Sequence, residues 1–318
     1  MPHIPRLRIL RAPLAVQTEL VTARRALITG ATGYIGSQLV NRLIADGWEV
    51  HIIVRAASDL TVLDCTAPDL RIHAHDGTAA TMNDLVGQAR PDVVFHLASL
   101  FLVQHQPDDV AKLVESNILF STQLVEAMMH HGIAYLVNTG TSWQHHGNEA
   151  YRPVNLYAAT KQAFESILAY YCDASPLKAT TLALFDTYGP NDPRKKLIAL
   201  LWQTAATQQP LLLSPGEQML DMVHIDDVLD AFVQAADILP NQVSQHVRYG
   251  VSSGAPMRLI DLVAEFERAT GTVLPIVWGG REYRPREVMI PWNLHTTVPG
   301  WTPRIPFEQG ILQTRAAS

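Results

Sequence analysis

The sequence has 318 residues, of which 47% are hydrophobic and 17% are charged, and its formal net charge is −6. These values indicate a globular protein with one large core or two smaller ones, and the negative charge argues against sequence-independent binding to nucleic acid. The two cysteines, Cys65 and Cys172, lie far apart without metal-ligand spacing. They therefore indicate neither a disulfide scaffold nor a zinc site.

The first 23 residues contain prolines and arginines and lack the long uncharged stretch of a cleaved signal peptide. We interpret residues 1–23 as an N-terminal extension. No later segment is apolar for long enough to cross a bilayer. We therefore expect a cytoplasmic protein without a membrane partner.

From Arg24 onward, short apolar runs alternate with longer segments of helical periodicity, the pattern of repeated strand–helix–strand units. Several runs are apolar on both faces, as in a parallel sheet covered by helices. The predicted fold is α/β, a Rossmann doubly wound parallel sheet. Strands are predicted at 25–29, 49–54, 71–75, 93–97, 134–139 and 179–185, and helices at 34–46, 82–88, 107–130 and 156–173.

Prolines become denser after Gly189, and the elements become shorter. We interpret residues 24–188 as the dinucleotide-binding domain and residues 189–220 and 252–318 as a smaller, discontinuous C-terminal substrate lobe. Residues 221–251 are expected to return to the first domain, because 246–251 again has the pattern of a buried strand.

A glycine-rich loop joins the first strand to the first helix. Glycines at this point allow a tight turn and a close approach of the backbone to a pyrophosphate, which the helix N-terminus then binds. The strand-to-helix context indicates a dinucleotide site. Its predicted cofactor-binding residues are Gly30, Thr32, Gly33, Tyr34, Ile35 and Gly36.

The end of the second strand indicates which dinucleotide is bound. An acidic residue there binds the ribose 2′-hydroxyl of NAD, whereas an arginine accommodates the 2′-phosphate of NADP. Here the strand ends in Arg55. We therefore predict NADP(H) over NAD(H); in the alternative, Arg55 is a solvated charge and Asp59 or another group binds the ribose.

Further cofactor contacts are predicted where later strands end. Asp76 follows the third strand and can accept a hydrogen bond from the adenine amino group. His96 is interpreted as an interior residue rather than a catalytic one. The remaining predicted contacts are Gly77, Leu97, Ala98, Ser99 and Thr139.

Tyr157 and Lys161 begin the predicted helix 156–173, and their spacing of four places both side chains on one face. An ammonium beside a phenol stabilises the phenolate and is expected to lower the pKa of Tyr157, which makes it a usable acid or base. Lys161 can also donate to the cofactor ribose. The pair is predicted to transfer the proton that accompanies hydride transfer.

A hydroxyl after the fifth strand can hold the substrate oxygen. Counting residues forward from the end of the strand favours Thr141 as this hydroxyl, whereas counting back from His146 favours Ser142. Both are kept as candidates, and Thr141, Ser142 and Trp143 are predicted to contact the substrate. The neighbouring histidines have no accompanying ligand set, so no metal is predicted.

Together the motifs GATGYIGS, HLAS, NTGTS, YAATK and YGP resemble the extended short-chain dehydrogenase/reductase family, the NAD-dependent epimerase/dehydratase group, over nearly all of the chain after Arg24. This resemblance implies a Rossmann domain with a C-terminal substrate lobe and a homodimer. It also implies that Asn117 is the central-helix asparagine, a structural and proton-relay position.

The stretch GEQMLDMVHIDDVLDAF resembles members that act on nucleotide-linked sugars, although Leu220 stands where many have an arginine. Arg281, Arg284 and Arg286 could instead contact the diphosphate, since guanidinium groups suit phosphate. The alternative is an ordinary basic loop. The predicted partner is a nucleotide-sugar substrate.

The resemblance leaves three reaction types open: dehydration, epimerisation and reduction. Dehydratases of the family place Asp-Glu after the catalytic threonine, whereas Ser142 and Trp143 follow Thr141 here. Epimerases typically retain NAD, and Arg55 favours exchangeable NADPH. The stretches TGTSWQHH and YRPREVM most resemble 4-ketoreductases of CDP-linked deoxy sugars, so a reductase is predicted. An epimerase and an NADP-binding regulatory protein without turnover are the alternatives.

Overall fold

The computed structural model describes residues 23–315, so nearly all of the predicted N-terminal extension lies outside the described residues. A seven-stranded parallel sheet runs in the order β11-β6-β5-β4-β1-β2-β3. This order confirms the predicted Rossmann fold, and the strand at 246–251 does return to pair with β6. The strands are β1 (Arg25–Thr29), β2 (Glu49–Arg55), β3 (Leu70–His75), β4 (Val93–His96), β5 (Tyr135–Thr141), β6 (Lys178–Leu184) and β11 (His246–Val251).

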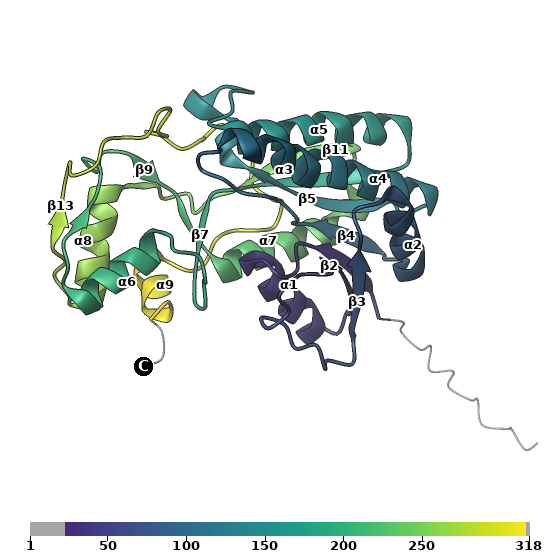
Figure 1. Cartoon of the computed structure of the whole chain (residues 1–318), viewed down its shortest axis with the longest axis horizontal. Helices are drawn as coiled ribbons and strands as arrows, with labels where there is room; N and C mark the ends of the chain where they lie inside the picture. The colour runs from purple at the N-terminus through teal and green to yellow at the C-terminus, as the bar shows by residue number, and fades with distance from the viewer. Residues whose placement is uncertain (1–22, 316–318) are drawn as a thin grey trace, which may run out of the picture.

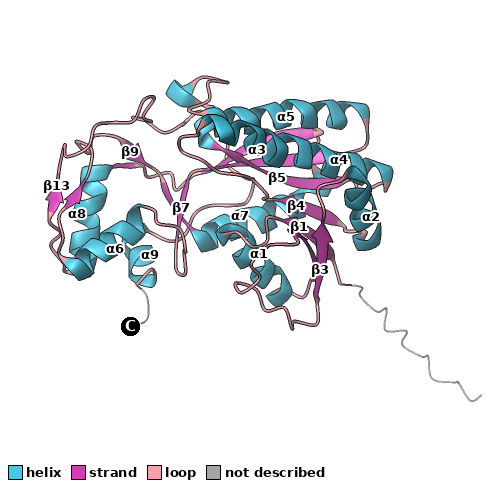
Figure 2. Cartoon of the chain, in the orientation of Figure 1, coloured by secondary structure: helices cyan, strands magenta, loops and turns pink. Residues whose placement is uncertain are grey.

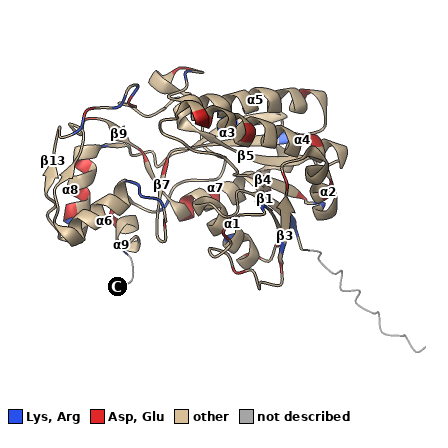
Figure 3. Ribbon diagram, viewed as in Figure 1, with Lys and Arg blue, Asp and Glu red and all other residues tan. Residues whose placement is uncertain are grey.

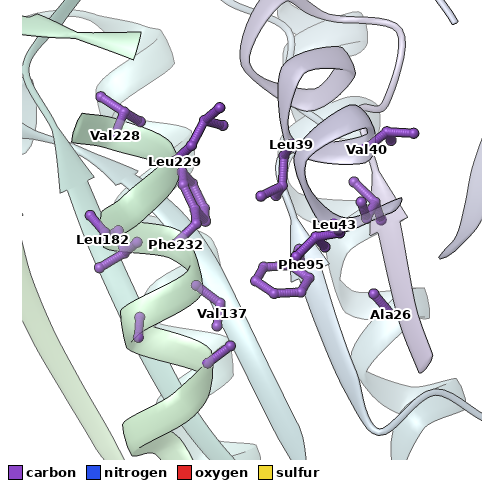
Figure 4. Close-up of a cluster of buried hydrophobic side chains, with 14 of the residues drawn as sticks. Ala26, Leu39, Val40, Leu43, Phe95, Val137, Leu182, Val228, Leu229 and Phe232 are labelled. Carbon is purple, nitrogen blue, oxygen red and sulfur yellow. The ribbon is translucent and has the colours of Figure 1, made fainter. Parts of the chain in front are cut away.

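Helices cover both faces of the sheet (Figure 1). On one face lie α1 (Tyr34–Ala45) and α7 (Ile225–Ile238), and on the other lie α2 (Ala79–Ala89), α4 (Phe120–His130) and α5 (Leu156–Ala174). Figure 4 shows how the first face is filled: Phe95 of β4 lies between Leu43 of α1 and Phe232 of α7. A separate buried cluster fills the other face, and the close packing on both faces holds the carboxyl ends of the strands in fixed positions.

The predicted helix 107–130 is not one regular α-helix. It consists of the 3-10 turn Pro107–Asp109, α3 (Val110–Val114), the π-helical turn Glu115–Leu119 and α4. A π turn adds a residue to the helical repeat, which reorients the side chains on either side, and such turns are frequent at functional sites. Asn117 lies within this turn and is fully buried.

A second cluster of elements packs beside the carboxyl edge of the sheet (Figure 2). It has its own core, which contains Leu201, Leu262 and Phe266. Within it β7 pairs with β10, β9 with β12, and β8 with β13. Its elements are β7 (Asp186–Tyr188), α6 (Leu197–Thr207), β8 (Leu211–Leu212), β9 (Met219–Leu220), β10 (Met222–His224), β12 (Met257–Arg258), α8 (Leu259–Thr270), β13 (Ile276–Val277) and α9 (Phe307–Gln313); short 3-10 turns lie at Ser142–Gln144, His146–Asn148 and Leu239–Asn241.

The chain after β13 returns to the first core. Trp292, Val298 and Trp301 are buried there, and Trp301 Nε1 donates to the backbone carbonyl of Asp227 at 2.9 Å. The Asp227 carboxylate accepts from the backbone N–H groups of Arg304 and Ile305 at 2.9 and 3.0 Å. Asp227 therefore anchors the C-terminal segment to α7.

Basic and acidic residues are scattered over both parts of the ribbon (Figure 3). None of the helices between residues 23 and 315 is both long and apolar enough to span a membrane. No cluster of potential metal ligands occurs among the described residues either.

Candidate active site

The glycine-rich loop is tightly packed. Gly30 has φ +75°, and a Cβ on it would lie 2.6 Å from the backbone nitrogen of Ala98. A Cβ on Gly36 would lie 2.1 Å from the carbonyl oxygen of Gly30. Gly33 precedes α1 and provides no side-chain cap. The first backbone N–H groups of α1 are therefore available to bind an anionic ligand such as a pyrophosphate.

The side chain of Tyr34 points away from this loop toward the second cluster of elements. Its hydroxyl donates to the Pro190 carbonyl at 3.1 Å, and the Arg194 guanidinium lies 4.6 Å from its ring centroid. Thr32 and Ile35 are half-buried. Tyr34 therefore connects the predicted pyrophosphate loop to the segment that follows β7.

The residues predicted to contact the adenosine lie at the ends of β2 and β3, where Arg55 pairs in register with His75. Arg55 is exposed. Asp76 accepts from the backbone N–H and the hydroxyl of Thr78 at 2.9 and 2.8 Å, and these bonds lower its pKa to about 2. Gly77, at φ +96°, completes the turn.

His96 is fully buried and both ring nitrogens are bonded, to Thr29 at 2.7 Å and to Ser121 at 2.8 Å. This agrees with its interpretation as an interior residue. Leu97 and Ala98 continue the strand past the glycine loop, where the Ala98 N–H donates to the Thr29 hydroxyl at 3.2 Å.

Asn117 joins three segments of the site. Its Oδ1 accepts from the hydroxyl of Ser99 at 3.1 Å and the N–H of Leu100 at 2.7 Å. Its Nδ2 donates to the Leu100 carbonyl at 3.1 Å and to Thr160 at 2.9 Å. The asparagine thus ties the end of β4 to α5.

Tyr157 and Lys161 lie on one buried face of α5, which Asn155 caps by accepting from Ala158 N–H at 2.9 Å. Burial raises the pKa of Tyr157 to about 12, while hydrogen bonding with Ser99 and Thr141 acts in the opposite direction. The expected lowering of the Tyr157 pKa is therefore wrong for this structure, because desolvation outweighs the stabilisation of the phenolate.

Lys161 is almost completely buried, and its Nζ has no hydrogen-bond partner among the described residues. Burial lowers the pKa of Lys161 to about 8, and Glu165 opposes that shift. The Thr139 hydroxyl is also buried without a partner in the described part of the chain. Buried polar groups normally have partners, so these two atoms indicate a place for a polar ligand.

The residues present fit a dinucleotide. The glycines let the backbone of the loop fold tightly before α1, and the buried Lys161 amino group, which has no partner among the described residues, is a donor that a ribose hydroxyl could use. Thr141 is buried and contacts Tyr157, whereas Ser142 is half-buried and lines a large cavity. The structure thus brings both candidate hydroxyls to the same end of the sheet.

This cavity, of about 850 Å³, lies between the sheet edge and the second cluster of elements. Its wall includes Phe101, whose ring centroid lies 4.9 Å from that of Tyr157 and 5.6 Å from that of Trp143. The size is typical of a small-molecule site. It places an aromatic wall next to the predicted proton donor.

The three predicted arginines differ in position. Arg284 and Arg286 line the cavity, whereas Arg281 is not among its lining residues. Arg284 forms a two-point ion pair with Glu287 at 2.7 and 3.0 Å, and Arg286 donates to the carbonyls of Pro153 and Val154.

Sequence reasoning missed Asp186, Lys196 and Arg194, which also line the cavity. Asp186 begins β7 and lies two residues after the end of β6, so a search for polar residues near strand ends could have found it. Burial raises the pKa of Asp186 and lowers that of Lys196, and each opposes the other's shift. Lys196 and Arg194 lie in an irregular segment whose sequence contains no motif that would predict a binding site.

Comparison with known proteins decides the family. A model of the NAD dependent epimerase/dehydratase family matches residues 26–247. The chain belongs to this family. Its members are NAD(P)-dependent enzymes that modify nucleotide sugars, so the predicted family and enzyme class are confirmed.

Similar proteins include both sugar-nucleotide epimerases and CDP-abequose synthases. The chain is 28% identical to a UDP-glucose 4-epimerase of Mycolicibacterium smegmatis, over 91% of this chain and 97% of the relative. It is 26% identical to a CDP-abequose synthase of Yersinia pseudotuberculosis, over 84% and 91%. The structure of Thermus thermophilus UDP-glucose 4-epimerase in complex with NAD has a TM-score of 0.75 and 25% identity, with 91% of this chain and 97% of that chain covered.

Proposed function

We propose that this protein is an NADPH-dependent reductase of a keto group on a nucleotide-activated deoxy sugar, of the CDP-4-keto-deoxyhexose type. The observation that carries net reduction is Arg55 at the exposed end of β2, where it can pair with a 2′-phosphate. A reductase consumes one NADPH in each turnover and must therefore exchange its cofactor, whereas an epimerase can return the hydride to the sugar.

Bound NADPH would supply the hydride. The loop of Gly30, Gly33 and Gly36 would hold its pyrophosphate, and Lys161 would donate to its ribose. Tyr157 would give its proton to the carbonyl oxygen of the sugar. Because burial keeps Tyr157 protonated up to a pKa of about 12, this enzyme would begin each turnover with the proton available.

Thr141 and Ser142 would hold the same carbonyl oxygen. Phe101 and Trp143 would cover the reacting carbon from the cavity side and exclude water. The nucleotide diphosphate would lie farther along the cavity, near Arg284, Arg286 and Lys196. Arg281 does not line the cavity and would not contact the diphosphate there.

The absence of an Asp-Glu pair after Thr141 argues against dehydration. The second candidate function is a nucleotide-sugar 4-epimerase, which the 28% identical relative favours. A cytoplasmic location and a homodimer formed through the helices at 107–130 and α5 remain predictions.

The experiment is to follow NADPH oxidation with CDP-4-keto-6-deoxyglucose, beside a parallel incubation with UDP-glucose and NAD. Stoichiometric oxidation with the keto sugar supports the reductase. Interconversion of UDP-glucose and UDP-galactose without NADPH consumption supports the epimerase. Cofactor binding without turnover of any carbonyl would support a regulatory protein.

A further inference from the structure

A second buried ionic group lies behind the proposed catalytic residues. Glu165 follows Lys161 by one helical turn on α5, and only 2% of its side chain is exposed. Its carboxylate accepts from Arg248 Nε of β11 at 2.9 Å and also pairs with Arg248 Nη2. Its other oxygen accepts from Gln144 Nε2 at 2.8 Å.

Gln144 belongs to the segment of residues 141–144, which we call the hydroxyl loop. Its Oε1 accepts from the backbone N–H of Thr141 at 2.9 Å, and its Nε2 also donates to Gln162 at 2.9 Å. Both side-chain ends of Gln144 are therefore used: one fixes the backbone of the loop, and the other fixes α5.

Gly140 makes room for this network. A Cβ on Gly140 would lie 3.1 Å from Gln144 Oε1 and 3.1 Å from Glu165 Oε1, tighter than ordinary contact. The absence of a side chain at this position of β5 lets the buried carboxylate approach the loop. The Gln144 amide is fully buried, so a lost partner there is costly.

The network also reaches the C-terminal segment. Arg248 Nη1 bonds His145 Nε2 at 3.2 Å, and the His145 ring stacks on Trp292 with centroids 3.9 Å apart. Trp292 lines the cavity. The same ion pair thus contacts α5, the return strand and the wall of the proposed substrate site.

We propose that Glu165 and Gln144 are positioning residues, which together hold the hydroxyl loop against the helix that carries Tyr157. This inference rests on the proposed function, since the loop acts on a substrate carbonyl only if one is reduced. Neither residue touches the reacting atoms. Their loss misplaces the oxygen-binding hydroxyls without removing them, and such displacements cost catalysis more than binding.

The test compares Gln144→Ala and Glu165→Gln with Glu308→Gln, an exposed glutamate that pairs with Arg268 at 3.4 Å. Gln144→Ala leaves the Glu165–Arg248 pair in place, so it avoids an uncompensated buried charge. We expect at least a tenfold loss of kcat in the first two variants with KM and NADPH affinity within about twofold of wild type, and no change in Glu308→Gln.

Hydrogen-exchange mass spectrometry provides a readout that needs no substrate. Peptides covering residues 138–146 should exchange faster in Gln144→Ala, because the Thr141 N–H loses its acceptor, while peptides of β1 and β2 should not change. Unchanged exchange, or faster exchange with wild-type kcat, would overturn the inference. Inactivity of the wild type on keto sugars, with the exchange difference present, would instead refute the proposed function.

Discussion

The Asn117 amide donates to the Thr160 hydroxyl at 2.9 Å, and Thr160 in turn donates to the Tyr157 carbonyl at 2.7 Å. This connection links the π turn to the helix that carries the proposed proton donor. Because Asn117 also holds both backbone groups of Leu100, its four hydrogen bonds fix the end of β4.

Replacing Asn117 with alanine should therefore lower both stability and activity. The half-buried backbone groups of Leu100 and the buried Thr160 hydroxyl would lose partners, and an unsatisfied buried group costs about 1–3 kcal/mol. Thermal unfolding and kcat should both fall, and Thr122→Ala, which loses one bond to the Ile118 carbonyl at 2.8 Å, is the matched control. A variant with wild-type melting temperature would contradict this assignment.

Arg55→Asp should reverse the cofactor preference. A carboxylate at the end of β2 would repel the 2′-phosphate of NADPH and accept a hydrogen bond from the 2′-hydroxyl of NADH. The affinity for NADPH should therefore fall by roughly tenfold or more, because a hydrogen bond to a charged group contributes about 1.5–3 kcal/mol. Fluorescence titration with NADPH and NADH measures this. Arg71→Asp, at the opposite end of neighbouring β3, should leave the ratio unchanged. An unaltered preference in Arg55→Asp would remove the argument for NADPH.

The two hydroxyls of the hydroxyl loop can be separated by single substitutions. Ser142 lines the cavity and Thr141 contacts Tyr157, so Ser142→Ala should raise KM for the sugar and lower kcat. Thr141→Val keeps the shape but removes the contact with the phenol, and should mainly lower kcat. Steady-state kinetics of the two variants show which hydroxyl binds the substrate oxygen. Wild-type kcat and KM in both variants would exclude both hydroxyls from this role.

Activity should decline as the pH rises through about 8. Lys161 acts as a charged donor, and since burial lowers its pKa to about 8, the ammonium is lost above that pH while Tyr157 remains protonated. Glu165 on the same helix opposes the lowering of the Lys161 pKa, and Lys161 in turn contributes to the lowered pKa of buried His96 of β4. The pH profile of kcat/KM reports the free enzyme. Lys161→Arg should move the alkaline decline upward, and a profile flat to pH 10 would contradict this account.

Much of the fold followed from sequence because the strands are buried on both faces and glycines or prolines separate them from helices. All six predicted first-domain strands begin within one residue of those observed, and the predicted strand 246–251 matches β11 at both ends. The prediction of one continuous helix at 107–130 was wrong, because apolar residues recur through this whole segment and do not reveal the five-residue π turn Glu115–Leu119.

The candidate site was less predictable. Arg55, Asp76 and the glycine loop could be found because strand ends in a parallel sheet share one edge. Arg281 shares its basic sequence context with Arg284, and sequence alone could not show which of them faces the cavity. The direction of the Tyr157 pKa shift depends on burial, which neighbouring residues in the sequence do not reveal.

The most direct test of the central claim is single-turnover hydride transfer from NADPH to CDP-4-keto-6-deoxyglucose by the wild type and Tyr157→Phe. Wild type should consume one NADPH per sugar reduced, and Tyr157→Phe should bind NADPH normally but react roughly 10²–10⁴-fold more slowly, the usual contribution of a general acid. A Tyr157→Phe variant with near wild-type rate, or sugar conversion without NADPH consumption, would contradict the account.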